Sequence, residues 1–267
     1  MWKTGTKFKK AFRYATAGFR ALPDFIIIGA MKAGTTSLFS ALTQHPKIIR
    51  SHTKETHFFN SHYHRGLYWY RSNFPFARRL AGGGKTGEAT PQYIYHELVP
   101  ERIHQTLPEV KLIAMLRNPT ERTISQYFHE VRKGREDLPM MKAFRAEEER
   151  LAGVLRKDDF ANPLYIHASY KKRGVYHEQI RRFLRYFPRE QLLVLDSDEF
   201  FADPAGSIKP VFQFLEVDEA FPVDGIEHKN IGWNRTRVEP EVYEYLNDYF
   251  APHNRELYSL LGRSFPW

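Results

Sequence analysis

The chain has 267 residues, with 40 Lys and Arg against 31 Asp and Glu, a formal net charge of +9 and no cysteine. This length suits one large domain or two small ones, and a hydrophobic content of 42% indicates a globular protein rather than a disordered one. The absence of cysteine excludes a disulfide scaffold, a thiolate zinc site and a cysteine nucleophile.

Six of the nine positive charges lie in a terminal arm, residues 1–22, which contains no acidic residue. The apolar residues of this arm recur at three- and four-residue spacing: Phe8, Phe12, Ala15, Phe19 and Leu22. The spacing predicts a basic amphipathic helix. We expect a terminal helix that packs on the domain or a frayed tail, with weak contact of an interfacial helix to a membrane surface as the alternative. No apolar run approaches the ~20 residues of a transmembrane helix, and no signal-peptide pattern occurs.

The body of the chain, residues 23–267, alternates short apolar runs with helical stretches. The runs at 24–29, 111–116 and 191–195 are typical of buried strands, and they precede helical stretches at 35–44, 119–133 and 204–215. This alternation predicts an α/β fold of three layers, with a central, mostly parallel sheet flanked by helices. No linker rich in Pro, Gly or Ser divides the body, so we expect a single domain.

Two further stretches have helical composition. Residues 134–170 contain acidic clusters at 147–149 and 158–159, and this pattern indicates either a helical insertion on the surface or a mobile lid over a site. Residues 240–261 are predicted to be helical with an interruption at Pro252.

The loop 29–37, Gly-Ala-Met-Lys-Ala-Gly-Thr-Thr-Ser, follows the first predicted strand and opens the first predicted helix. Backbone amides at such a helix start bind phosphate-like anions. A P-loop kinase would have lysine where Thr35 stands, and the lysine of this loop, Lys32, lies before the second glycine. Because Asp196 ends a strand and could hold magnesium, a kinase-type phosphotransferase stays open as an alternative.

Two motifs are similar to those of sulfotransferases that use 3′-phosphoadenosine 5′-phosphosulfate (PAPS). The loop 29–37 resembles the 5′-phosphosulfate loop of this family, and residues 117–127, Arg-Asn-Pro-Thr-Glu-Arg-Thr-Ile-Ser-Gln-Tyr, resemble its 3′-phosphate motif. The resemblance implies a P-loop-like fold, PAPS as the sulfuryl donor with PAP (adenosine 3′,5′-bisphosphate) as product, and no metal. The donor-binding residues that it implies are Lys32, Ala33, Gly34, Thr35, Thr36, Ser37, Arg117, Ser125, Tyr176 and Arg235.

A third block, Lys-Glu-Thr-His-Phe-Phe at 54–59, is similar to the heparan sulfate sulfotransferase branch. The resemblance implies Glu55 as the general base that accepts a proton from an acceptor hydroxyl, and Lys32 as the residue that stabilises the leaving group. The alternative base is His57, whose ordinary pKa is ~6.5. In an extended segment Glu55 and His57 share a face and Lys54 points away, outside the catalytic set. The adjacent phenylalanines predict burial that raises the pKa of Glu55.

The acceptor stays open between a carbohydrate hydroxyl and a lipid or polyketide-type hydroxyl. The stretch 88–93 follows the Glu-Lys-Thr/Ser-Pro-x-Tyr motif of the same branch, but Ala89 stands at the lysine position. The aromatic residues at 63–74 either line an acceptor cleft or form core, and we expect Trp69 and Tyr70 in the core.

Other functions receive less support from the sequence. Four histidines could suggest a metal site, but they lack the His-x-x-x-His spacing and the matched carboxylate of such sites: His52, His62, His64 and His96. Outside the arm, the chain has 34 basic and 31 acidic residues, and this near balance of charge disfavours a nucleic-acid-binding module. The lack of cysteine and of an apolar span favours a cytoplasmic, bacterial enzyme.

Overall fold

The computed structural model describes residues 3–226 and 238–267, with the side chains of 3–7 excepted. The chain divides into two compact units that alternate along the sequence. Unit 1 comprises Met1–Ala30, Gly34–Met115 and Leu184–Lys229, and unit 2 comprises Met31–Ala33, Leu116–Phe183 and Asn230–Trp267. The single domain expected over residues 23–267 stays a prediction.

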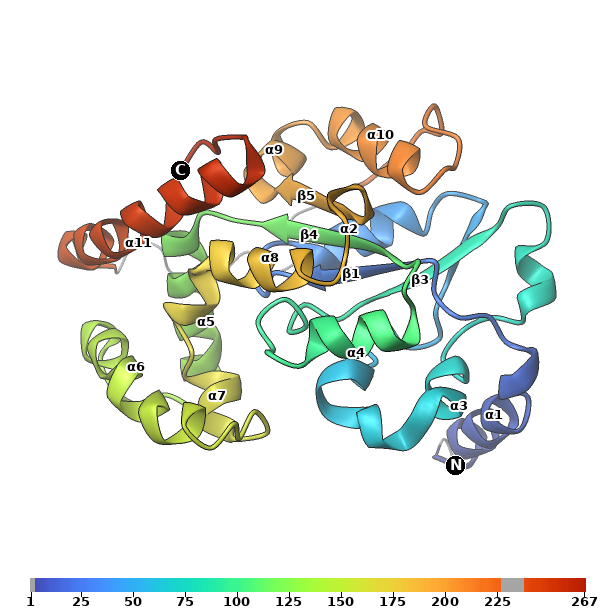
Figure 1. The fold of residues 1–267 in the computed structure, drawn as a ribbon, viewed down its shortest axis with the longest axis horizontal. Helices are drawn as coiled ribbons and strands as arrows, with labels where there is room; N and C mark the ends of the chain where they lie inside the picture. Colours follow the sequence, from blue (N-terminus) through green and yellow to red (C-terminus); the bar gives the residue numbers. More distant parts are fainter. Residues whose placement is uncertain (1–2, 227–237) are drawn as a thin grey trace. The chain divides into compact units, whose positions relative to one another are not determined.

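Unit 1 is built on a five-stranded sheet of order β2-β3-β1-β4-β5 (Figure 1). Its strands are β1 (Phe25–Gly29), β2 (Ile48–Arg50), β3 (Lys85–Ala89), β4 (Lys111–Leu116) and β5 (Leu192–Asp196). β1 pairs in parallel with β3 and β4, and β2 pairs in parallel with β3. All five residues of β1 are buried, as expected for a strand covered on both faces. The predicted α/β class and the three predicted strands are confirmed.

Helices cover both faces of this sheet. In Figure 1, α2 (Thr35–Leu42), α9 (Ser197–Ala202) and α10 (Pro204–Phe214) lie on one side, and α4 (Val99–Thr106) lies on the other. The short helix α3 (Gly66–Arg71) belongs to the same unit and packs against the terminal arm. The helices predicted after the first and third strands are confirmed as α2 and α10.

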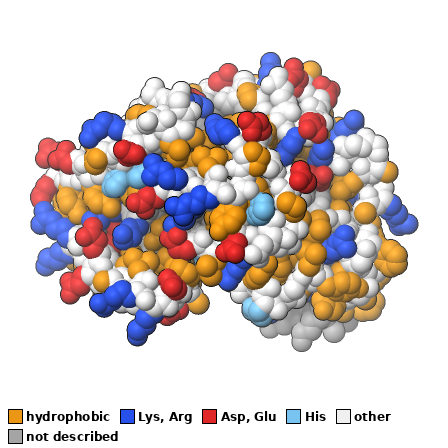
Figure 2. Space-filling view, viewed as in Figure 1, with side chains coloured by type: hydrophobic (Ala, Val, Ile, Leu, Met, Phe, Trp, Pro, Cys, Tyr) orange, Lys and Arg blue, Asp and Glu red, His pale blue; other side chains and the backbone are white. Residues whose placement is uncertain are grey.

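The terminal arm forms α1 (Lys3–Ala15), so the predicted helix is confirmed, and it packs on unit 1 against α3 although part of its apolar face is exposed. Phe8 and Phe19 are 75% exposed and Phe12 is 51% exposed. Hydrophobic side chains accordingly gather at the surface beside the undescribed side chains of this helix (Figure 2). Two edge-on ring contacts hold the arm on this unit: Tyr14 with Tyr68 of α3 at 5.2 Å, and Phe12 with Phe76 at 6.5 Å. No described helix is both long and apolar enough to cross a membrane.

Unit 2 is helical, with α5 (Pro119–Arg132), α6 (Met140–Leu155), α7 (Pro163–His167), α8 (Tyr176–Leu184) and α11 (Pro240–Leu261). Phe144 of α6, Tyr170, and Leu246 and Phe250 of α11 are buried in one hydrophobic cluster. The helix expected within 134–170 is therefore present as α6 and contributes to the core of this unit, whereas its description as an insertion stays a prediction. Whether this stretch also moves as a lid stays a prediction.

The predicted interruption of the last helix at Pro252 is also wrong, because α11 runs through this residue. A proline inside a helix removes one backbone hydrogen bond. Phe250 and Leu257 are buried on either side of Pro252. The apolar burial of both helix halves therefore offsets the missing bond.

Candidate active site

The start of α2 in unit 1 has the geometry of an anion site. Gly34 adopts φ +95°, and a Cβ at this position would lie 2.7 Å from the ring of Phe201. Only glycine fits there without strain. The backbone amides from Gly34 to Ser37 then open the helix, where orphan N–H groups and the helix dipole attract phosphate-like groups.

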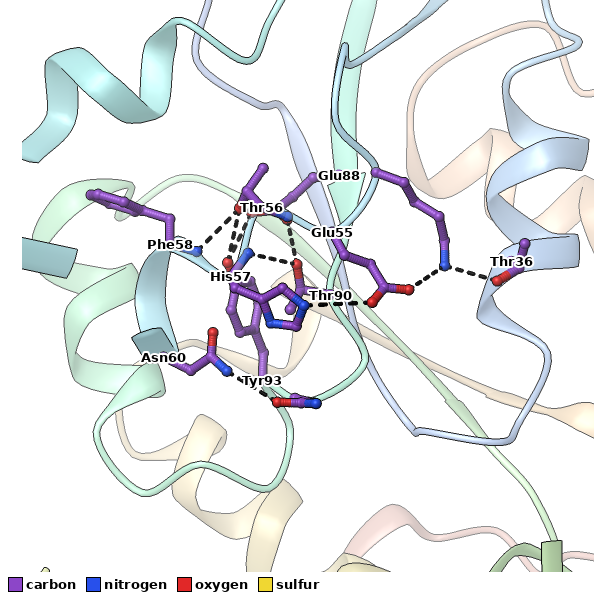
Figure 3. Close-up of polar contacts among 11 residues, drawn as sticks. Thr36, Glu55, Thr56, His57, Phe58, Asn60, Glu88, Thr90 and Tyr93 are labelled. Carbon is purple, nitrogen blue, oxygen red and sulfur yellow. Dashed lines mark hydrogen bonds and ion pairs between the residues drawn. The ribbon is translucent and has the colours of Figure 1, made fainter. Parts of the chain in front are cut away.

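An ion-paired cluster of three side chains connects this helix start to the 54–57 segment (Figure 3). The Lys54 ammonium donates to Thr36 Oγ1 and to Glu55 Oε1, each over 2.8 Å. On its other side, Glu55 Oε2 lies 3.6 Å from His57 Nε2. We call Glu55 and His57 the acid–histidine pair. Their expected proximity is confirmed, the expectation that Lys54 points away from them is wrong, and its place outside the catalytic set stays a prediction.

The prediction for Lys54 failed because the segment is not a regular strand. His57 adopts the left-handed conformation with φ 51°, and Phe58–His62 turn into a short π-helix. The strict alternation of side chains therefore ends before His57. Phe58 and Phe59 turn into the core of unit 1, away from the carboxylate.

The predicted rise in the pKa of Glu55 is also wrong. The contact with His57 and, after it, the bond to Lys54 together lower the pKa of Glu55 to about 2, against the opposing effect of burial. The carboxylate is 41% exposed. Glu55 is therefore ionised and can accept a proton, but in this arrangement it is a weak base.

A buried carboxylate, Glu88 of β3, holds the 54–57 segment in place (Figure 3). Glu88 is fully buried and accepts bonds from four hydroxyl groups, those of Thr56, Tyr70, Thr90 and Tyr93, at 2.6 to 3.2 Å. The Thr56 amide donates a further bond over 3.3 Å. Because Thr56 separates the two members of the acid–histidine pair, this network positions both. The sequence placed Glu88 in the 88–93 motif but assigned it no role, and membership of that motif was the available signal.

In unit 2, the predicted donor residues Lys32 and Arg117 lie together. Arg117 Nη1 donates to the Lys32 carbonyl over 3.1 Å, and the Tyr176 hydroxyl donates to the Arg117 carbonyl over 2.9 Å. Burial lowers the pKa of Lys32, and the charges of Arg132 and Arg117 lower it further. Such mutual repulsion between cations is relieved when an anion binds among them. Tyr176 itself is buried, so within the unit it positions Arg117.

Two residues of α5 that sequence reasoning missed join this basic group. His129 and Arg132 follow Ser125 by four and seven residues, so the three side chains share one face of the helix. Burial lowers the pKa of His129 to about 4, and the charge of Lys32 contributes next. The helical spacing from Ser125 was the signal that could have identified them.

The structure also shows the surroundings of several other residues that were predicted to belong to the site. Ala33, Thr35 and Ser37 are buried, and Arg235 lies outside the described residues. Asp196 Oδ1 accepts from the amides of Asp198 and Glu199 and so caps α9, a role different from the magnesium ligand of a kinase. Among the residues that the structure describes, no three His, Asp or Glu side chains are grouped to hold a metal ion.

A cavity of about 510 Å³ opens beside the acid–histidine pair in unit 1. Its wall includes both members of the pair and Lys10, Arg13, Tyr14, His62, Arg65 and Trp69. Tyr70 lies in the core as expected, but Trp69 faces this cavity and is only half-buried. The expectation that Trp69 belongs to the core is therefore wrong.

The chain is similar to sulfotransferases over most of its length. Residues 22–231 match the sulfotransferase domain family. The mouse (Mus musculus) heparan sulfate glucosamine 3-O-sulfotransferase 3B1 is 32% identical over 277 residues, which cover 95% of this chain and 67% of that protein. The human (Homo sapiens) heparan sulfate glucosamine 3-O-sulfotransferase 6 is 32% identical, with 94% and 75% covered. The crystal structure of a sulfotransferase from Alicyclobacillus acidocaldarius is 32% identical, with a TM-score of 0.71 and 92% and 98% covered.

Proposed function

The chain belongs to the sulfotransferase family. From this premise, we propose which of its residues bind PAPS and which of them promote the transfer of its sulfuryl group to an acceptor hydroxyl. The protein is a PAPS-dependent sulfotransferase with the P-loop-like fold of its family. This membership disfavours the kinase and nucleic-acid alternatives. The acceptor oxygen forms a bond to sulfur, the bond between sulfur and the 5′-phosphate of PAPS breaks, and PAP leaves.

For the donor, we assign the amides of Gly34 to Ser37 to the 5′-phosphosulfate and Lys32 to the leaving oxygen. Arg117 and Ser125 are assigned to the 3′-phosphate. The support lies within each unit: an anion-binding helix start in unit 1, and in unit 2 a cationic group whose members lower the pKa of Lys32. Ala33, Thr35 and Tyr176 shape the backbone of these sites, and a role for Arg235 stays a prediction.

For the acceptor, we assign Glu55 as the general base that takes the hydroxyl proton. Its pKa of about 2 is maintained by His57 and Lys54, so the base strengthens if one of these contacts is released. Lys54 is shared between Glu55 and Thr36 of the donor helix. A phosphosulfate at this helix start attracts the ammonium group, and Glu55 then regains basicity. His57 is the alternative base and otherwise orients the carboxylate.

Two measurements test these assignments. PAP without magnesium should raise the melting temperature of the wild type. Lys32→Ala and Arg117→Ala should remove most of that rise, whereas the exposed control Lys142→Ala should keep it. In turnover with PAPS, Glu55→Gln should lose at least about 100-fold in kcat, the contribution expected of a general base. A loss below about tenfold, or a larger loss in His57→Gln, would move the base to His57.

We propose a carbohydrate hydroxyl as the acceptor. The half-buried Trp69 ring and the polar groups of Thr53, Ser72 and Asn73 line the cavity, a combination suited to a sugar ring and its hydroxyls. The compared mouse and human enzymes are named for a glucosamine acceptor. Transfer of labelled sulfate from PAPS to a panel of sugar, lipid and acyl-carrier-bound hydroxyls tests this, and preferred labelling of a lipid or acyl chain would contradict it.

We also propose a weak membrane-surface contact through the arm, because the side chains of Phe8, Phe12 and Phe19 are each at least half exposed on it. Co-sedimentation with phosphatidylglycerol vesicles should fall in Phe8→Ser/Phe12→Ser, and equal binding of the variant would contradict the contact. A cytoplasmic, bacterial setting stays a prediction, since the compared proteins come from mammals as well as from Alicyclobacillus acidocaldarius.

A further inference from the structure

The basic face of α1 forms part of the cavity beside the acid–histidine pair. Lys10, Arg13 and Tyr14 have the spacing i, i+3 and i+4, so they share one face of the helix, and all three line the cavity. The exposed Phe8 and Phe12 fall on the opposite face. The helix is therefore oriented with its cations toward the cavity and its apolar face outward, the reverse of an amphipathic helix that packs on a core.

The cations of this wall have no acidic partner. Across the part of the chain that the structure describes, no carboxylate forms an ion pair with Lys10, Arg13 or Arg65. Among the described lining residues, the one carboxylate is Glu55, which is already bound to Lys54. Burial lowers the pKa of His62, and the charge of Arg65 lowers it further. An uncompensated group of cations with this arrangement attracts an anionic ligand.

Aromatic rings lie among these cations. The Arg65 guanidinium stacks 5.1 Å from the centroid of Trp69, and Tyr14 is 50% exposed. Flat rings beside cations suit a ligand that has both a ring to stack on and an acidic group to pair with. The cavity of about 510 Å³ is within the usual size range of ligand sites.

We propose that this cavity binds an acceptor that carries fixed negative charge near its reactive hydroxyl, and that Lys10 and Arg13 of α1 select for that charge. This inference rests on the proposed function, because the reacting hydroxyl must approach Glu55. The terminal arm is then a specificity element of the acceptor site. Lys10 and Arg13 bind acceptor groups remote from the reaction, so their loss affects acceptor affinity and leaves the donor site unchanged.

The test uses two probes with the same ring hydroxyls, an α-1,4-linked galacturonic acid hexamer and its fully methyl-esterified form. Calorimetric titration in the presence of PAP measures binding, and transfer of labelled sulfate from PAPS is measured separately. The wild type should bind the acidic hexamer at least about tenfold more tightly than the ester. Lys10→Ser/Arg13→Ser should lose most of this preference. The matched control Lys9→Ser, on the same helix but outside the cavity wall, should retain it.

Folding and donor binding are checked in each variant by the melting temperature and by its rise with PAP, which should equal those of the wild type. Equal binding of both probes by the wild type, or an unchanged preference in the double variant, would overturn the inference. A preserved binding preference without any label transfer to either probe would support the cavity assignment and contradict the proposed carbohydrate acceptor. Equal transfer to both probes would contradict the cavity assignment alone.

Discussion

The buried carboxylate of Glu88 provides a sharp test of how the catalytic segment is held. Glu88→Gln keeps the size of the side chain but replaces one acceptor oxygen by an amide donor. Glu88 Oε1 accepts the hydroxyls of Thr56, Tyr70 and Tyr93, and Oε2 accepts the Thr90 hydroxyl and the Thr56 amide. Both oxygens of Glu88 accept hydrogen bonds, so the NH₂ group of glutamine replaces an acceptor in either orientation of the amide. The donors on that side then have no acceptor.

The cost of this substitution follows from the number of donors left unsatisfied. One buried unsatisfied donor costs about 1–3 kcal/mol, so we expect Glu88→Gln to lower the free energy of unfolding by about 2–4 kcal/mol. At about 2–4 °C per kcal/mol for a chain of this size class, the melting temperature should fall by roughly 4–16 °C. The exposed control Glu190→Gln should change the free energy by less than about 0.5 kcal/mol.

Urea unfolding followed by circular dichroism gives both values, and turnover with PAPS gives the functional effect. Because Thr56 lies between the members of the acid–histidine pair, kcat should fall while the stabilisation by PAP persists in folded protein. Burial raises the pKa of Glu88 against the effect of its hydroxyl donors. A cost equal to that of Glu190→Gln would show that Glu88 is held as a neutral acid, and would refute the reasoning.

Three further predictions follow from single contacts. Lys54→Ala removes a cation that lowers the pKa of Glu55, so the acidic limb of the pH–kcat/KM profile should move to higher pH; an unshifted limb would contradict the assigned contact. The pKa of His129 is about 4 in the folded protein and ~6.5 when unfolded, so the unfolded chain binds more protons between these values. Stability should therefore fall as the pH drops from 6.5 to 4, with a flatter profile in His129→Gln by urea unfolding at several pH values. Gly34→Ala places a Cβ 2.7 Å from Phe201 at a positive φ, so it should cost at least about 1 kcal/mol and abolish the thermal shift with PAP; an unchanged shift would argue against the helix start as donor site.

The parts of the fold that could be predicted are those where local sequence and burial agree. β1 and β4 are continuous apolar runs, so their burial on both faces is visible in the sequence. β3, with the sequence Lys-Thr-Gly-Glu-Ala, lacks such a run, yet four of its five residues are buried. Its strand conformation is imposed by pairing with β1 and β2, which no local pattern reports.

The same limit explains what was predicted of the site. The motifs identified Glu55 and His57, and their contact is present in the structure. Lys54 lies in a segment without strand conformation, where a β-alternation rule does not predict the direction of a side chain. The role of Glu88 depends on hydroxyl groups from three separate segments, and only tertiary structure brings them together.

The position of Lys54 between Thr36 and Glu55 has a thermodynamic consequence for the whole cycle. If donor binding draws Lys54 from Glu55, the two events share one coupling free energy, and reciprocity requires each to influence the other equally. A substitution that removes the charge of Glu55 releases the Lys54 ammonium group from this contact before the donor binds. Glu55→Gln should therefore bind PAP more tightly than the wild type, typically about fivefold or more, while it turns over slowly. In the wild type, the contact between Lys54 and Glu55 lowers the affinity of the donor site for its ligand. The same contact keeps Glu55 a weak base until PAPS binds.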